Sequence, residues 1–148
     1  MNKYKELKQK HQEEVNKFPM AFAFSKEQVK EGLVKLGLKE NDVDKVVAIA
    51  GGGFIKKTDV QAYDEMFDRQ YKELQDAIKN DVTGEGFVKD MFDEELGNNE
   101  YGYTRSLTDT LMAVGLAYKD IVENENLKNG LNLALKRYEE KEEEQEVW

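Results

Sequence analysis

Residues 58–80 read TDVQAYDEMFDRQYKELQDAIKN, and this stretch decides the fold class. Its large apolar side chains recur at spacings of three and four residues, which places them on one face of an α-helix. The side chains of this stripe are Val60, Tyr63, Phe67, Tyr71, Leu74 and Ile78. It is the longest such stripe in the chain, so we expect its helix to be the central one.

Shorter stripes with the same spacing predict further helices on both sides of this stretch. We expect them over residues 4–18, 25–36, 42–50, 87–96, 107–114 and 127–138, with a helical turn near 120–123. Ser25 is placed to cap a helix, and Gly37 supplies the positive φ that commonly ends one. Residues 20–24 and 100–104 are expected to be extended and to form a minor two-stranded element. The sequence thus predicts a compact, mainly α fold, a bundle of about six helices.

Length and charge suggest how this fold is organised. A chain of 148 residues is typical of one domain, so we expect a single helical domain over residues 1–138. The formal net charge is −9. Residues 139–148 hold six glutamates and one lysine, so this acidic C-terminal tail supplies −5 of that charge. Acidity of this kind argues against direct nucleic-acid binding, which needs Lys and Arg to displace the counterions of phosphate groups.

The composition also argues against several chemistries. The chain has no cysteine and a single histidine, His11, so thiol nucleophiles, disulfides and histidine-rich metal sites are excluded. We therefore expect no enzyme activity, no cofactor and no metal. A membrane-spanning helix needs a run of about 18 apolar residues, and the chain has no such run. The first ten residues lack the apolar core of a signal peptide. A cytoplasmic protein is expected.

A glycine-rich segment, Gly51 to Thr58, partly resembles a phosphate-binding loop. Lys57 and Thr58 occupy the positions of the Lys-Ser/Thr pair, but Lys56 stands where the second glycine should be. An anion site there would use five residues of this segment, which are Gly52, Gly53, Lys56, Lys57 and Thr58. The alternative is a glycine that ends one helix, a loop, and a threonine that caps the next helix.

The segment from Asp81 to Val88 partly resembles a calcium-binding loop. Oxygen-bearing residues and a glycine fit the first positions, but Phe92 stands where a bidentate glutamate is required. The alternative is that Asp81 and Thr83 form a turn and cap the following helix.

Residues 98–105, NNEYGYTR, are the segment that packing explains least. Tyrosine and arginine dominate binding hot spots because they bury a large area at a small cost in entropy. The candidate partner-binding residues are Asn99, Glu100, Tyr101, Tyr103 and Arg105. The alternative is a pair of tyrosines packed against the core. Phe54, Lys56 and Lys57 form a second candidate surface.

Several short motifs between Ala21 and Gly130 carry a resemblance to a known family. They include FS with EQ at 24–28, LGL at 36–38, GGGFI at 51–55, TGEGF at 83–87, NEY at 99–101 and DTL at 109–111. With these motifs the chain resembles a family of small proteins, without an assigned function, from Firmicute phages, plasmids and integrated mobile elements. The resemblance implies no activity. It implies a setting in which small proteins often act as inhibitors or adaptors of a host protein.

These observations favour a non-enzymatic accessory protein that binds another macromolecule. The resemblance suggests an inhibitor of a host defence protein, comparable to anti-CRISPR factors, and a nucleic-acid-processing enzyme is one candidate partner. The acidic faces could then mimic DNA, although the concentration of charge in the tail weakens that variant. The second hypothesis is a nucleotide- or phosphate-binding protein that uses residues 51–58. The sequence gives no oligomeric state.

Overall fold

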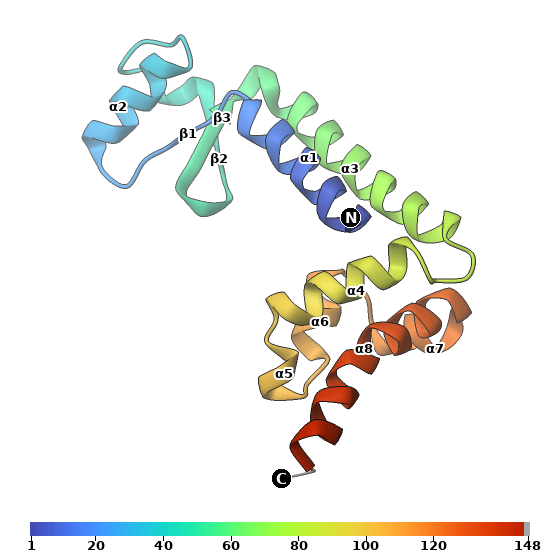
Figure 1. The fold of residues 1–148 in the computed structure, drawn as a ribbon. Coiled ribbons are helices and arrows are strands. Elements are labelled where there is room, and N and C mark those ends of the chain that lie inside the picture. Colours follow the sequence, from blue (N-terminus) through green and yellow to red (C-terminus); the bar gives the residue numbers. More distant parts are fainter. Residues whose placement is uncertain (147–148) are drawn as a thin grey trace. The chain divides into compact units, whose positions relative to one another are not determined.

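The computed structural model describes the backbone of residues 1–146 and the side chains of residues 1–139, and it is mainly helical with a small antiparallel sheet (Figure 1). Within the described residues the α-helices are α1 (Lys3–Lys17), α2 (Lys26–Lys35), α3 (Val60–Asn80), α4 (Phe87–Asn98), α5 (Tyr101–Thr104), α6 (Thr108–Ala113), α7 (Tyr118–Glu123) and α8 (Glu125–Glu146). The strands are β1 (Ala21–Phe22), β2 (Val46–Ile49) and β3 (Gly53–Lys56). The mainly α prediction is confirmed, with more helices than the six expected.

The chain divides into two compact units, and helices α1 and α3 each contribute to both. The first unit consists of residues 1–11 and the chain from Lys72 onward, and the second consists of residues 12–71. The expectation of one domain over residues 1–138 stays a prediction. Of the expected acidic tail, the backbone as far as Glu146 continues helix α8, and the side chains beyond Glu139 lie outside the described residues.

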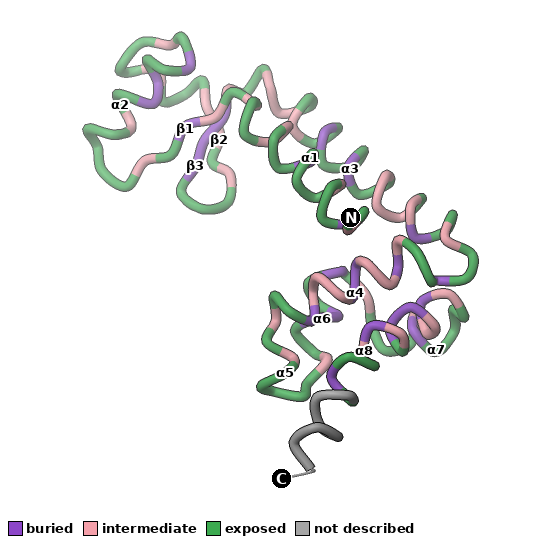
Figure 2. Tube along the Cα trace, viewed as in Figure 1, coloured by how far each residue is buried: buried purple, intermediate pink, exposed green. Residues whose placement is uncertain are grey.

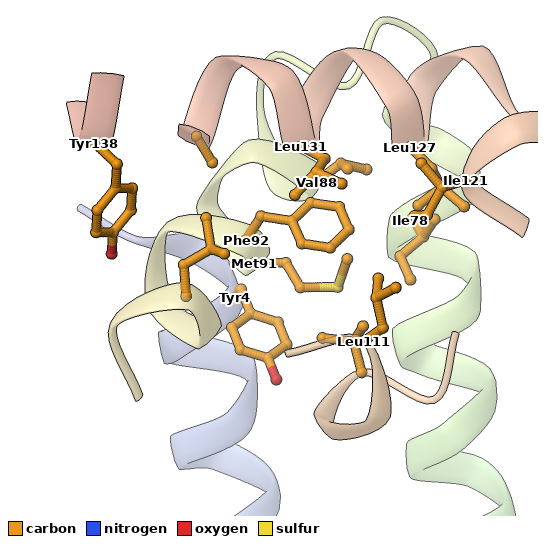
Figure 3. Packing of buried hydrophobic residues seen from close by; sticks show 13 residues of the cluster. Tyr4, Ile78, Val88, Met91, Phe92, Leu111, Ile121, Leu127, Leu131 and Tyr138 are labelled. Carbon is orange, nitrogen blue, oxygen red and sulfur yellow. The ribbon is translucent and has the colours of Figure 1, made fainter. Parts of the chain in front are cut away.

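The core of the first unit is built mainly on α4 and α8 (Figure 3). Its buried side chains are Tyr4, Ile78, Val88, Met91, Phe92, Leu96, Leu111, Val114, Ile121, Leu127, Leu131, Ala134 and Tyr138. Full burial of one large apolar side chain contributes about 1.5–3 kcal/mol to folding. Most of these core residues lie in the two helices that the sequence predicts over residues 87–96 and 127–138.

The second unit contains the sheet, with strand order β1-β3-β2 (Figure 1). Ala21 pairs with Phe54, and Val47 pairs with Ile55. Helix α2 packs on one face of the sheet, where Leu33 and Leu36 join Ala21 and Phe54 in a small core. The predicted helix start is confirmed, because the Ser25 side chain accepts a hydrogen bond from the Gln28 N–H at 3.2 Å.

The predicted helix over residues 42–50 is wrong, because residues 46–49 form strand β2. Val46, Val47 and Ile49 are β-branched, and side chains of this kind favour strands. A hairpin then becomes possible because Gly51 and Gly52 take φ values of 77° and 80°, a conformation that suits glycine. Strand β3 therefore follows a glycine turn, at the position where the sequence predicts the end of a helix.

The predicted extended element near 100–104 is also wrong, because residues 101–104 form helix α5. The partner of β1 is β3, which lies within residues 51–58, where the sequence predicts a loop. The expectation that residues 20–24 are extended is confirmed over Ala21–Phe22.

Helix α3 exists as predicted, but it is less central than expected. Much of helix α3 is exposed or intermediate (Figure 2). Phe67 is 39% exposed and Tyr71 is 65% exposed, although both belong to the longest apolar stripe. Met66, which lies outside that stripe, is buried instead. Periodicity identified the helix correctly, but the predicted stripe is buried only in part, at Ile78.

Candidate partner-binding site

Helix α5 is a single turn held between two residues of unusual backbone geometry. Within the described chain, Glu100 and Arg105 are the non-glycine residues with positive φ, each at 55°. They immediately precede and follow Tyr101–Thr104. Residues other than glycine rarely adopt this left-handed backbone conformation, and backbone strain of this kind concentrates at functional sites. The chain is thus turned sharply at both ends of α5.

Two aromatic rings and two guanidinium groups fix α5 to helix α8. The rings of Tyr101 and Tyr138 meet edge to face, with centroids 5.0 Å apart. The Arg105 guanidinium carbon lies 5.6 Å from the Tyr101 centroid and 5.9 Å from that of Tyr138. Arg137 lies 4.7 Å from the Tyr138 centroid. We call Tyr101, Arg105, Arg137 and Tyr138 the tyrosine cluster.

Further contacts hold the cluster in place. One Arg137 guanidinium nitrogen donates to the Tyr138 hydroxyl at 2.7 Å and to the Asp93 carbonyl at 2.8 Å. A Cβ at Gly102 would lie 3.3 Å from the Tyr138 ring, so a larger residue there would crowd it. The cluster is therefore a packed platform of cation–π and hydrogen-bonding contacts.

Tyr103 differs from Tyr101 because it is 94% exposed. Tyr101 is half-buried in the cluster, and the Asn99 amide donates to the Glu95 carbonyl at 2.8 Å. The structure thus brings together the five candidate residues from 99 to 105 around α5. The packed alternative describes Tyr101, whereas Tyr103 has the exposure that a contact residue needs.

Sequence reasoning missed the contribution of helix α8 to this site. Tyr138 was expected only as part of the core stripe at 127–138, and Arg137 was not singled out. No local pattern connects these residues with Tyr101, because they are far apart in the chain. The one sequence signal for this part of the site is that Arg137 stands next to Tyr138, the last aromatic residue of the stripe at 127–138.

The candidate anion-binding residues do not converge on one point. Gly52 and Gly53 lie at the hairpin, whereas Lys57 and Thr58 follow the other end of β3. A four-residue strand spans about 13 Å, so the glycine backbone and the lysine are separated by the length of β3. Gly53 is itself paired in the sheet with Phe22 and Ile49. The expected cradle of backbone N–H groups is not formed.

The lysines near that end of β3 have acidic neighbours. Lys45, Lys56 and Lys57 line a small hollow of about 180 Å³ that also includes Asp44. The Lys56 ammonium lies 3.9 Å from Asp59, and the Lys45 ammonium lies 3.7 Å from Asp42. Phe54 of the second candidate surface is buried, so it cannot contact a partner.

Asp81 forms the predicted turn and cap. Its carboxylate accepts backbone hydrogen bonds from Gly84 at 3.2 Å, Gly86 at 3.1 Å and Val88 at 2.9 Å. Phe92, at the position where calcium would need a glutamate, lies fully buried in the core. The capping alternative therefore describes this loop.

The described residues contain neither a clustered set of metal ligands nor a membrane-spanning helix. Within this part of the chain, no three His, Cys, Asp or Glu side chains are grouped so that they could hold a metal ion. None of the described helices has the length and apolar character required to cross a bilayer.

A known protein family covers nearly the whole chain. The family, described as a family of unknown function (DUF7659), matches residues 3–137. The chain belongs to this family. The match includes α5, Arg105 and Arg137, and so most of the tyrosine cluster. No curated protein and no solved structure matches the chain. The expected family without an assigned function is thereby confirmed, whereas the phage or mobile-element origin stays a proposal.

Proposed function

We propose that the protein catalyses no reaction and acts by binding another protein through the surface around α5. The observation that carries this proposal is the exposed Tyr103 on a helical turn bracketed by Glu100 and Arg105, both left-handed. Strain of this kind costs on the order of 1–3 kcal/mol per residue and persists only where the surroundings impose it.

The tyrosine cluster explains how such a surface would bind well. Its contacts restrict the conformations of Tyr101 and Arg105 before any partner arrives, so less side-chain entropy is lost on binding. Tyr103 then presents a large amphipathic ring beside this platform. Exposed tyrosine next to ordered arginine is the composition typical of interface hot spots.

The partner we propose is a host protein, and the activity is inhibition of a defence function. The resemblance to proteins of phages and mobile elements supports this finer proposal. Residues 1–11 and 72–148 together carry a formal charge of −7, so this unit would favour a basic partner such as a nucleic-acid-processing enzyme. Phosphate binding by residues 51–58 stays the second candidate, but the separation of its glycines from Lys57 gives it less support.

Site-specific photo-crosslinking tests the proposal. A photoreactive phenylalanine analogue replaces Tyr103 in one variant and Tyr118 in a control, because Tyr118 is also an exposed tyrosine of the first unit, 64% exposed, but lies outside α5. After irradiation in lysate of the natural host, we expect one discrete adduct through position 103 and none through position 118. Equal adducts from both positions, or none from either, would contradict the proposed surface.

A further inference from the structure

A second surface, in the unit of residues 12–71, has features that α5 does not explain. Two adjoining hollows of about 410 and 310 Å³ flank strand β1, and both are lined by Phe22 and Lys35. The larger one is also lined by the end of α1 and by Pro19, and the smaller one by Gln28 and Glu31 of α2. We call them together the β1 groove.

Strand β1 is an edge strand of the sheet, with β3 on one side. Ala21 pairs with Phe54, and the Ala23 N–H donates to the Gly52 carbonyl at 3.1 Å. In an antiparallel ladder the bonded residues alternate, so Phe22 directs its own N–H and C=O away from β3. The next outward N–H along this edge, that of Phe24, donates to the Gln28 side chain at 2.7 Å, so Phe22 supplies the outward backbone groups that a further strand can pair with.

Two aromatic rings stand at this edge with much of their surface exposed. Phe22 is 51% exposed and Phe24 is 81% exposed. A Cβ at Gly53 would lie 2.8 Å from the Phe22 ring, and one at Gly52 would lie 2.8 Å from the Phe24 ring. The inner sides of both rings thus rest against the glycine hairpin, which holds them while they stay open to a ligand.

The charge of the groove is opposite to that of the protein. Lys17 and Lys35 line it together with a single acid, Glu31, in a chain of net charge −9. The ion pairs found among the described residues involve neither lysine. A ligand with carboxylates would therefore gain attraction without displacing an existing ion pair.

We infer that the β1 groove binds an extended acidic peptide as a fourth strand of the sheet. The peptide backbone pairs with the outward N–H and C=O of Phe22, in the manner of β-strand addition. Alternate apolar side chains pack on Phe22 and Phe24, and the carboxylates between them approach Lys17 and Lys35. This surface is separate from α5 and adds a second binding activity to the proposed one.

Fluorescence anisotropy with defined peptides tests the inference. The probe is a fluorescein-labelled eight-residue peptide of alternating Glu and Val, and the comparison peptide alternates Lys and Val. We expect saturable binding of the acidic peptide below about 1 mM and none of the basic one. Methylation of alternate backbone nitrogens should abolish binding, because it removes the donors that strand pairing needs.

Matched variants separate the groove from general charge effects. Lys17→Glu with Lys35→Glu should weaken binding at least about tenfold. Lys30→Glu with Lys39→Glu makes the same change of charge outside the groove and should alter binding less than about twofold. Circular dichroism checks that each variant is folded, and Phe24→Ser, which changes no charge, should also weaken binding. Tyr103→Ala should leave it unchanged, which keeps this test distinct from that of α5.

Several results would overturn the inference. The first is that the acidic peptide does not bind. The second is that the methylated or the basic peptide binds as well as the acidic one. The third is that the two double lysine variants lose equal affinity for the acidic peptide. Binding of a labelled oligothymidine in place of the peptide would assign the groove to single-stranded nucleic acid. Self-association that Lys17→Glu with Lys35→Glu abolishes would assign it to a second copy.

Discussion

Tyr4 is a fully buried tyrosine in the core of the first unit. Its ring meets that of Phe87 edge to face, with centroids 5.9 Å apart. Burial raises the pKa of its hydroxyl far above the ordinary value, and the carboxylates of Glu95 and Glu94 raise it further. Each of these effects disfavours the charged phenolate, so Tyr4 stays neutral in the folded protein.

Because the pKa of Tyr4 is higher in the folded state than in the unfolded one, this residue makes stability fall at alkaline pH. Its contribution is complete below the unfolded value of about 10 and is lost as the pH rises above it. We expect the free energy of unfolding to fall by about 1.4 kcal/mol per pH unit there from this residue. Urea unfolding at several pH values measures this slope, and Tyr4→Phe should remove that part of it. An unchanged slope in Tyr4→Phe would contradict the account.

Gly130 is required where helix α8 passes close to Val88 of α4. A Cβ at position 130 would overlap the Val88 side chain and would lie 2.8 Å from the Gly84 carbonyl oxygen. We expect Gly130→Ala to destabilise the protein by about 1–3 kcal/mol through overpacking, measured by thermal or urea unfolding. The control is Gly97→Ala, whose Cβ would meet only the Arg137 side chain at 3.8 Å, and which should be neutral or stabilise by up to about 1 kcal/mol. Similar losses in both variants would show that close approach is not the cause.

At the scale of elements, helix α4 depends on Asp81 for its start. Three backbone N–H groups, those of Gly84, Gly86 and Val88, donate to this one carboxylate. Donors at the start of a helix have no partner within the helix, so a side chain or water must accept from them. Helix α4 supplies Val88, Met91, Phe92 and Leu96 to the core, so loss of the cap is felt beyond the loop.

We expect Asp81→Ala to lower the free energy of unfolding by about 1–2 kcal/mol. Asp81→Asn keeps one acceptor oxygen and should lose less. Glu85→Ala, in the same loop, changes the charge equally without removing the cap and serves as the control. Urea unfolding gives all three values, and a loss in Glu85→Ala as large as that in Asp81→Ala would contradict the capping role.

Elements whose apolar pattern agreed with their packing could be predicted from the sequence. The helices at 87–96 and 127–138 are examples, because each has one stripe and that stripe is buried. Strand β2 could not be predicted in this way, since Val46, Val47 and Ile49 suit a helix or a strand, and only its pairing with β3 decides between them. Helix α5 is too short to show a period, and tertiary contacts with Arg137 and Tyr138 fix it.

At the scale of the whole molecule, the sequence predicted which residues would be candidates but not how they gather. The five residues from 99 to 105 are neighbours in the chain, so they meet around α5 as expected. The residues from 52 to 58 are neighbours too, yet strand β3 separates the glycines from Lys57 and Thr58. Helix α8 completes the tyrosine cluster from a distant part of the chain, and the β1 groove joins parts of α1, β1 and α2. Such juxtapositions depend on tertiary structure.

The central claim is that the protein works through the exposed surface at α5. The most direct test is a binding titration of the crosslinked partner, once purified, against the native protein, Tyr103→Ala and Tyr118→Ala. Our account predicts that Tyr103→Ala raises the Kd about 30-fold, corresponding to the loss of about 2 kcal/mol that defines a hot spot, while Tyr118→Ala changes it less than about twofold. A native Kd in Tyr103→Ala, with the variant folded, would contradict the claim.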